Sequence, residues 1–160
     1  MEIRNVRKTD LDSLMTIERE GFTEGEAATK QAMLERIHLI ADTFLVAEKG
    51  GVVLGYINGP VIDKPFITDD LFERITTNPS RGGYQAILGV AVSEQARRQG
   101  IAASLFHEIE RLAKENGREG VTLTCKEELI SFYEKLGYVH CGRSNSVHGG
   151  VAWYNLIKRM

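Results

Sequence analysis

The order of hydrophobic and polar positions along the chain predicts one mixed α/β domain. Apolar residues recur at helical spacing over about residues 9–22, 29–40, 100–116 and 128–136. Short runs rich in β-branched and aromatic residues predict strands at 3–6, 44–48, 52–58, 86–92, 121–125, 138–141 and 152–157. Because helices are interspersed among the strands along the whole chain, we expect a single α/β (α+β) domain that covers residues 1–160.

Two stretches stand out from this pattern. Residues 86–92 are almost entirely apolar, as expected of a central strand that is buried on both faces. Residues 61–83 contain Pro65, Pro79 and the pair Gly82-Gly83, and predict an irregular loop with a short helix at about 69–73. Loops of this length in a small domain usually carry function or move.

Composition excludes several classes of protein. The 160 residues carry a net charge of −2, whereas a general nucleic-acid-binding protein usually shows a basic excess. Two cysteines, Cys125 and Cys141, are too few for a disulfide framework or a thiolate metal site. The first residues do not resemble a signal peptide, and no stretch approaches the length of a membrane span. We therefore expect a cytoplasmic protein without a metal, membrane or nucleic-acid partner; a homodimer stays open.

Residues 92–105 carry the clearest chemical signal. A buried strand ends at Val92, a polar turn follows, and a helix begins at Gly100. The first turn of a helix offers unpaired N–H groups to an anion, and Arg97 and Arg98 add positive charge. The alternative is an ordinary helix start with solvated arginines. The stretch is neither a Walker loop nor a Gly-x-Gly-x-x-Gly motif, so it indicates a phosphate-bearing ligand but not a dinucleotide.

This stretch resembles a known family. The pattern Arg97-x-x-Gly100-x-Ala102 matches the Arg/Gln-x-x-Gly-x-Gly/Ala signature of the GCN5-related N-acetyltransferases, and Ser131–Tyr138 resembles the second coenzyme-binding helix of that family. The resemblance implies a single mixed, mostly antiparallel sheet flanked by helices, with central strands that splay to bind coenzyme A. It also implies transfer of an acetyl group from acetyl-CoA, the cosubstrate, to a primary amine by direct attack in a ternary complex.

The resemblance assigns the coenzyme contacts to three segments. It implies that Val90, Ala91 and Val92 bind the pantetheine arm through backbone groups, although plain core packing of these side chains is equally compatible. Phe132 belongs to the second coenzyme-binding helix. The pyrophosphate is assigned to the following residues: Arg97, Arg98, Gln99, Gly100, Ile101, Ala102, Ala103 and Ser104.

Tyr133 matches the tyrosine that lies near the thioester sulfur in this family. The implied role is general acid to the departing thiolate, although transfer from a phenol to a thiol is uphill by about 2 kcal/mol. The alternative is a helix tyrosine that packs with Phe132 and Leu136. Cys125 suggests a covalent acetyl-cysteine route, but no motif histidine stands beside it, which favours a core thiol.

Three further segments are similar to arylalkylamine (serotonin) N-acetyltransferases, namely Ile17–Phe22, Ile62–Lys64 and Cys125–Tyr133. This similarity favours an arylalkylamine-like small molecule as acceptor. The alternatives are a protein N-terminal or polyamine acetyltransferase, which an open acidic groove would favour, and a non-catalytic acyl-CoA-binding or sensing module. A closed aromatic tunnel would favour the aryl amine, and its candidate lining is Tyr56, Phe66, Phe72 and Tyr84.

The acceptor amine must lose a proton, and an alkylammonium is neutralised at pH 7 at a cost of about 4 kcal/mol. Vertebrate arylalkylamine enzymes carry two histidines in the strand before the coenzyme motif, where this chain has Ala86 and Leu88. The candidates for the base are therefore Glu26, His148 or a water relay. Glu26 belongs to a cluster of carboxylates that would attract a cationic amine; its members are Glu18, Glu20, Glu24 and Glu26.

Overall fold

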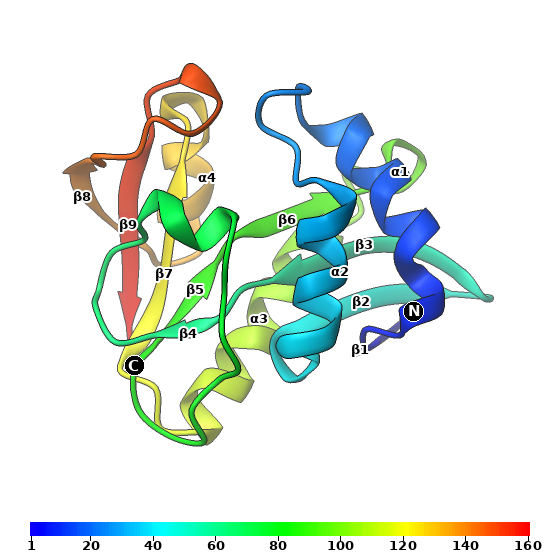
Figure 1. Cartoon of the computed structure of the whole chain (residues 1–160), viewed down its shortest axis with the longest axis horizontal. Helices are drawn as coiled ribbons and strands as arrows, with labels where there is room; N and C mark the ends of the chain where they lie inside the picture. Colours follow the sequence, from blue (N-terminus) through cyan, green and yellow to red (C-terminus); the bar gives the residue numbers. More distant parts are fainter.

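The chain forms nine strands and four α-helices in a computed structural model that describes residues 1–160 (Figure 1). The helices are α1 (Leu11–Gly21), α2 (Lys30–Leu39), α3 (Ile101–Glu115) and α4 (Ile130–Lys135). The strands are β1 (Glu2–Asn5), β2 (Phe44–Lys49), β3 (Val52–Asn58), β4 (Val61–Ile62), β5 (Tyr84–Ile87), β6 (Gly89–Val92), β7 (Gly120–Cys125), β8 (Val139–Arg143) and β9 (Tyr154–Arg159). All the predicted helices and strands are present, and the expected short helix in the long loop is the 3-10 helix η3 (Asp69–Phe72).

The strands form the mixed, mostly antiparallel arrangement that was expected, but the expectation of a single sheet is wrong, because their hydrogen bonding divides them into two sheets. The first has the order β1-β2-β3-β6 and the second β4-β5-β7-β9-β8. Only β5 and β7 pair in parallel. The two sheets share one stretch of chain, because β5 and β6 are the halves of the predicted strand 86–92, interrupted at Leu88. That single interruption therefore decides where the two sheets separate.

Beyond Leu88 the two central strands diverge. The register between β5 and β7 ends at Ile87 and Leu123, after which β6 pairs with β3 alone. Thr124 and Cys125 of β7 continue beside β9, so no strand lies between them and β6 (Figure 1). The splayed strands expected from the sequence are confirmed.

The helices cover both faces of the first sheet. Successive side chains of a strand point to opposite faces, and β2 follows this rule. Phe44 and Val46 pack with α1 and α2, whereas Leu45 packs with α3, where Leu105 and Ile109 are fully buried. Complete burial of a side chain of that size contributes about 1.5–3 kcal/mol, so α3 and the sheet fix one another firmly.

A close backbone contact holds the two sheets together near the divergence. A Cβ atom on Gly59 would lie only 1.8 Å from the carbonyl oxygen of Ala86, so no side chain fits there. The Ala86 N–H also donates to the carbonyl of Pro60, at 2.9 Å. The chain leaving β3 therefore comes into direct contact with β5 and continues alongside it as the antiparallel strand β4. None of the helices is both long enough and apolar enough to cross a lipid bilayer.

Candidate active site

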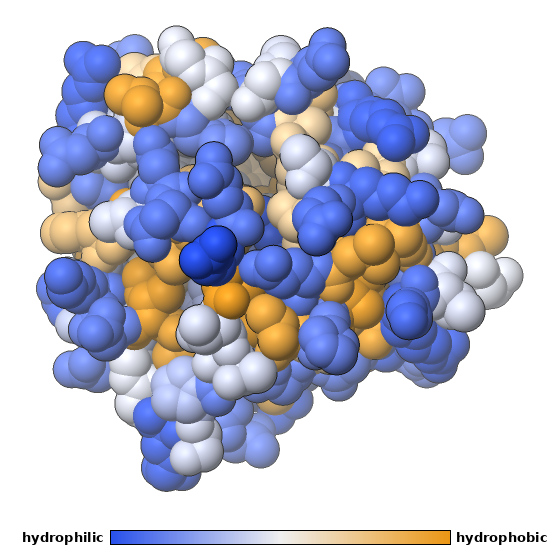
Figure 2. All heavy atoms as spheres, viewed as in Figure 1, coloured by the Kyte–Doolittle hydropathy of each residue, from blue (hydrophilic) through white to orange (hydrophobic).

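A cavity of about 610 Å³ opens where the strands diverge. Its walls come from α1, the α1–α2 loop, α2, the β5–β6 junction, β7 and the segments around η3 and η6 (His148–Gly150). In the space-filling view the same face is hollowed at its upper centre, between the α1–α2 side and the β7–β9 side (Figure 2). The lining includes Glu18, Glu26, Arg36, Leu88, Tyr133 and His148.

The free edge of β6 faces this gap. The Ser93 N–H donates to the carbonyl of Leu54 on β3, at 2.8 Å. Because alternate residues of an antiparallel strand bond to the same neighbour, the backbone groups of Val90 and Val92 point away from β3, toward the gap. Their side chains pack against the α3 core. The side chains of the strand therefore pack in the core, while the outward N–H and carbonyl of Val90 and the N–H of Val92 are available for an extended ligand; the Val92 carbonyl accepts from Arg97.

The loop that joins β6 to α3 presents a row of unused donors. None of the backbone N–H groups from Arg97 to Ala103 donates a hydrogen bond within the chain. Arg98 and Gly100 both adopt the left-handed backbone conformation, with φ of 65° and 77°. Consecutive N–H groups in such a bend form an anion-binding concavity. The loop therefore fits a pyrophosphate, and the first turn of α3 adds its partial positive charge.

The two arginines of this loop are arranged differently. The Arg97 side chain turns back, with Nε 3.2 Å from the carbonyl oxygen of Val92 and a terminal nitrogen 3.4 Å from that of Glu20. It therefore braces the loop against the ends of β6 and α1. Arg98 is exposed and forms no hydrogen bond, so its charge is free to meet a solvent-facing phosphate.

Tyr133 lies on α4 at the opposite side of the gap. Its ring packs edge-on against Phe106, at 5.4 Å between centroids, and against Phe132, at 5.0 Å. Tyr133 lines the cavity, and its hydroxyl forms no hydrogen bond within the chain. Burial raises the pKa of the phenol, as does the neighbouring Cys125. The group is therefore a protonated donor, and packing and catalysis are compatible roles for it.

Cys125 also lines the cavity but is a weak nucleophile. It is a free thiol, and burial, together with Glu128, raises its pKa to about 11. The thiolate is the reactive form of cysteine, and little of it exists at neutral pH. The geometry therefore disfavours an acetyl-cysteine intermediate, in agreement with the expectation from the sequence.

The Glu26 carboxylate lies in the cavity wall, where two neighbouring side chains bind it. The Lys126 ammonium approaches one oxygen to 2.5 Å, as an ion pair outside hydrogen-bond geometry, and the Thr23 hydroxyl donates to the other at 2.7 Å. Burial alone would raise the pKa of this carboxyl, but Lys126 and Thr23 outweigh it and lower the pKa. Glu26 is therefore ionised and weakly basic.

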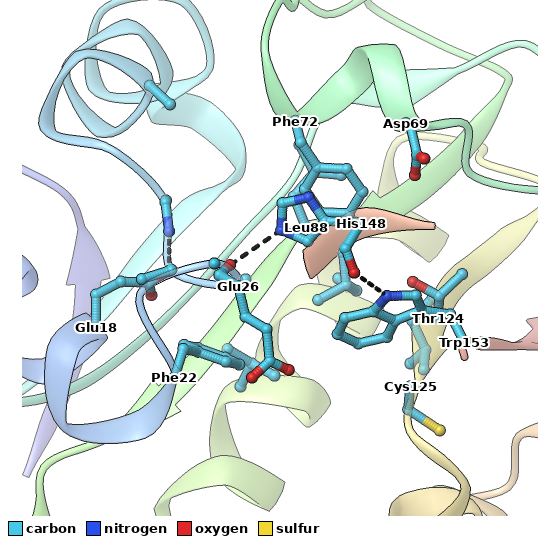
Figure 3. Close-up of a pocket in the computed structure, with 18 of the residues that line it drawn as sticks. Glu18, Phe22, Glu26, Asp69, Phe72, Leu88, Thr124, Cys125, His148 and Trp153 are labelled. Atoms are coloured by element: carbon cyan, nitrogen blue, oxygen red, sulfur yellow. Dashed lines mark hydrogen bonds between the residues drawn. The ribbon is translucent and has the colours of Figure 1, made fainter. Parts of the chain in front are cut away.

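His148 lies beside Glu26, although 122 residues separate them in the chain. Its ring stacks on Phe72, with centroids 4.3 Å apart. Its Nε2 is 3.0 Å from the main-chain oxygen of Glu26, and its own carbonyl accepts from the indole N–H of Trp153 (Figure 3). A carbonyl only accepts hydrogen bonds, so Nε2 carries a proton. In the neutral ring, Nδ1 is then free to take up a second proton.

The acidic cluster predicted from the sequence separates into different roles. Glu18 is buried, accepts from the Ala28 N–H at 2.7 Å and from the Tyr56 hydroxyl, and burial raises its pKa. Glu20 accepts from the Glu94 N–H outside the cavity. Glu24 is exposed at the cavity. Two more acids that line the cavity, Asp69 and Glu73, come from the long loop.

The aromatic tunnel considered for an aryl amine does not form. Of its four candidates only Phe72 lines the cavity. Tyr56 is fully buried in the core, Phe66 borders a separate hollow, and Tyr84 is paired within the second sheet. Aromatic character comes instead from Phe22 and Trp153. Nothing in the sequence of the loop 61–83 indicates which of its aromatic side chains faces the cavity.

A splayed sheet with a free strand edge, followed by a loop of unused N–H groups, is the arrangement expected of an acyltransferase that binds coenzyme A. Residues 11–138 match the family model described as acetyltransferase (GNAT) family. The chain belongs to this family of acetyltransferases. The family assignment made from the coenzyme motif is confirmed.

Three relatives within this family resemble the chain. It is 31% identical over 140 residues to an N-alpha-acetyltransferase of Sulfurisphaera tokodaii, and this match covers 85% of this chain and 78% of that protein. It is 29% identical over 124 residues to the probable N-acetyltransferase family 8 member 5 of Mus musculus, covering 74% of this chain and 48% of that protein. The chain thus spans about half the length of the mouse relative.

The third relative is a solved structure, Chaetomium thermophilum Naa20 in complex with a bisubstrate analogue. It superposes with a TM-score of 0.77 at 25% identity, and the match covers 100% of this chain and 87% of the other. None of the three relatives is named an arylalkylamine acetyltransferase. The more specific resemblance suggested by the sequence therefore receives no support from them.

Proposed function

We propose that this protein transfers an acetyl group from acetyl-CoA to the α-amino group of a peptide or protein N-terminus. The observation that carries the proposal is the cavity at the strand divergence, which joins the free edge of β6 to Tyr133 and to a set of acidic side chains. A cationic amine is drawn to such a wall. The similarity to an N-alpha-acetyltransferase over most of the chain favours an α-amine as acceptor.

In this proposal the coenzyme is held by backbone groups. Val90 and Val92 pair with the pantetheine arm along the free edge, with Ala91 turned toward β3 between them. The unused N–H groups from Arg97 to Ala103 hold the pyrophosphate, and Ser104 of α3 and Phe132 of α4 are the other proposed coenzyme contacts. Acetyl-CoA supplies the activated thioester, and alignment of the amine with it provides much of the rate.

Tyr133 is proposed as the acid of the reaction. Its phenol is protonated because burial raises its pKa, and its hydroxyl has no other partner. It donates a hydrogen bond to the sulfur as negative charge develops there. Complete proton transfer is not required for this stabilisation. The higher pKa of the phenol relative to the thiol therefore does not prevent it.

His148 is proposed as the base, in preference to the Glu26 carboxylate. The carboxylate is paired with Lys126 and its pKa is lowered, so it binds a proton weakly. The Glu26 carbonyl still contributes, because it fixes the proton of His148 on Nε2. Nδ1 then receives the proton of the ammonium, directly or through a water molecule.

Two matched variants separate these candidates. His148→Gln is expected to lower kcat/KM by at least about tenfold and to change its pH profile between pH 6 and 9, because a base is lost. Glu26→Gln is expected to leave the shape of that profile unchanged, because a carboxyl whose pKa is lowered does not titrate in this range. Steady-state kinetics across pH would measure both. The opposite pattern would assign the base to Glu26.

An acceptor screen tests the proposed function itself. We expect short peptides with free N-termini to be acetylated with a higher kcat/KM than tryptamine, phenethylamine or spermidine. Mass spectrometry would locate the acetyl group on the α-amine, and N-formyl peptides provide the matched control. Preference for an aryl amine, for which Phe22, Phe72 and Trp153 in the cavity are the specific support, would overturn the N-terminal assignment. Binding of acetyl-CoA without transfer to any amine would indicate a sensing module.

A further inference from the structure

Arg36 is a buried arginine that has no role in the mechanism proposed above. It lies on α2, is only 3% exposed, and lines the cavity. Its guanidinium forms one hydrogen bond, from a terminal nitrogen to the Asn58 side-chain oxygen at 3.3 Å. No carboxylate oxygen of the chain lies within 4.0 Å of it. A guanidinium has five N–H donors, so most of them are unpaired.

The carboxylates that could neutralise Arg36 are held elsewhere. Both carboxylate oxygens of Glu18 accept hydrogen bonds from other groups, the Ala28 N–H and the Tyr56 hydroxyl. Glu35, the preceding residue, accepts from the Ile75 N–H at 3.0 Å. Neither forms an ion pair with Arg36, although both carboxylates oppose the lowering of its pKa by burial. The lack of a carboxylate partner is therefore built into the fold.

The surroundings of Arg36 have a surplus of donors. The Asn58 amide nitrogen, on the same side chain that accepts from Arg36, is buried without any acceptor. Burial of an uncompensated charge is strongly unfavourable, and arginine remains protonated in proteins. Such a group is stabilised by an anion, and a carboxylate matches the fork of a guanidinium with two parallel hydrogen bonds.

Arg36 also lies near the point where acetyl transfer is proposed. Asn58, its partner, stands opposite Gly89 in the β3–β6 register, and the Leu88 N–H donates to the Asn58 carbonyl at 2.9 Å. Leu88, Gly89 and Val90 line the same cavity as Arg36. A molecule whose amine reaches the thioester at the strand divergence can therefore extend a second group to Arg36.

We infer that Arg36 binds a carboxylate of the acceptor, carried a few bonds from the amine that is acetylated. The inference rests on the proposed function and narrows its substrate class. Acidic side chains of the cavity attract the ammonium, and the guanidinium of Arg36 in the cavity wall selects the carboxylate. Two sources share this chemistry: an acidic side chain at the first or second position of a peptide, and the free α-carboxylate of an amino acid.

Matched acceptor pairs test the inference. Peptides that differ only by Glu or Gln at position 1 or position 2 address the side-chain source, and glycine against glycinamide addresses the α-carboxylate. The wild-type protein is expected to prefer the carboxylate member of one pair by at least tenfold in kcat/KM, a ratio of the order expected for a charge-assisted hydrogen bond. Arg36→Met is expected to abolish this preference and to leave kcat/KM for the neutral member within about threefold.

Controls keep the outcomes separate. Arg36→Lys retains the charge and is expected to keep part of the preference, whereas Arg111→Met, on the exposed face of α3, is expected to keep all of it. Thermal melting and acetyl-CoA affinity report folding, and if Arg36→Met fails to fold, Arg36→Lys and the wild-type ratios still decide. Acetylation of peptides by the wild type without a carboxylate preference would overturn this inference alone. A preference that survives in Arg36→Met would do the same, whereas no acetylation of any acceptor would overturn the proposed function and this inference with it.

Discussion

Replacement of Tyr133 by phenylalanine is expected to lower kcat about 100-fold, with the KM for acetyl-CoA unchanged within about threefold. The variant removes only the hydroxyl, so the ring contacts with Phe106 and Tyr138 remain. What is lost is the donor that meets the developing thiolate, and acid catalysis of this kind typically contributes 10²–10⁴-fold. Steady-state kinetics with a thiol-detecting reagent would measure the effect.

Tyr138→Phe is the matched control. The Tyr138 hydroxyl donates to Glu110 at 2.7 Å, so its removal breaks a structural hydrogen bond and is expected to reduce the free energy of unfolding by about 1–3 kcal/mol. It should leave kcat unchanged, because Tyr138 does not line the cavity. Wild-type turnover in Tyr133→Phe, or an equal loss in both variants, would remove Tyr133 from the proposed chemistry.

Gly100→Glu is expected to weaken acetyl-CoA binding by about 100-fold or more. Gly100 caps α3 with a φ of 77°, a conformation that side chains other than glycine and asparagine adopt at a cost. A Cβ atom there would meet no atom of the chain within 4 Å, so the added carboxylate projects into the space assigned to the pyrophosphate. Calorimetric titration with acetyl-CoA would measure the dissociation constant.

Gly100→Asn separates backbone strain from charge. Asparagine tolerates the left-handed conformation and carries no charge, so this variant is expected to retain affinity within about tenfold. Unchanged affinity in Gly100→Glu would show that the pyrophosphate does not bind at this loop. An equal loss in both variants would attribute the effect to shape and not to electrostatic repulsion.

The segment proposed to hold the coenzyme could be singled out from sequence because its parts are contiguous. The free edge of β6, the turn and the first turn of α3 occupy residues 89–104, so local pattern and spacing describe this candidate site directly. The interruption at Leu88 is harder to predict from the sequence. An apolar run from 86 to 92 reads as one strand, and only pairing with two different neighbours divides it into β5 and β6.

The acceptor side could be predicted only in part, because long-range contacts assemble it. Glu26 and His148 were both candidates, yet nothing in the sequence indicated that they touch, and the pairing of Glu26 with Lys126 joins residues 100 positions apart. The sequence does not single out Arg36, since a polar residue on an amphipathic helix is usually solvated. Its burial without a carboxylate partner is a property of the tertiary structure alone.

The two sides of the cavity also differ in how freely they can change over evolutionary time. The proposed donor side, which would bind the coenzyme, depends on backbone groups in one continuous segment, whose shape is fixed by the core beneath it. The acceptor side is assembled from the α1–α2 loop, the segment around η3 and the segment around η6, joined where Glu26, Phe72 and His148 meet. Loops tolerate substitution and insertion far better than the elements that carry them. Acceptor choice can therefore diverge among relatives through these three loops while the donor segment stays constant.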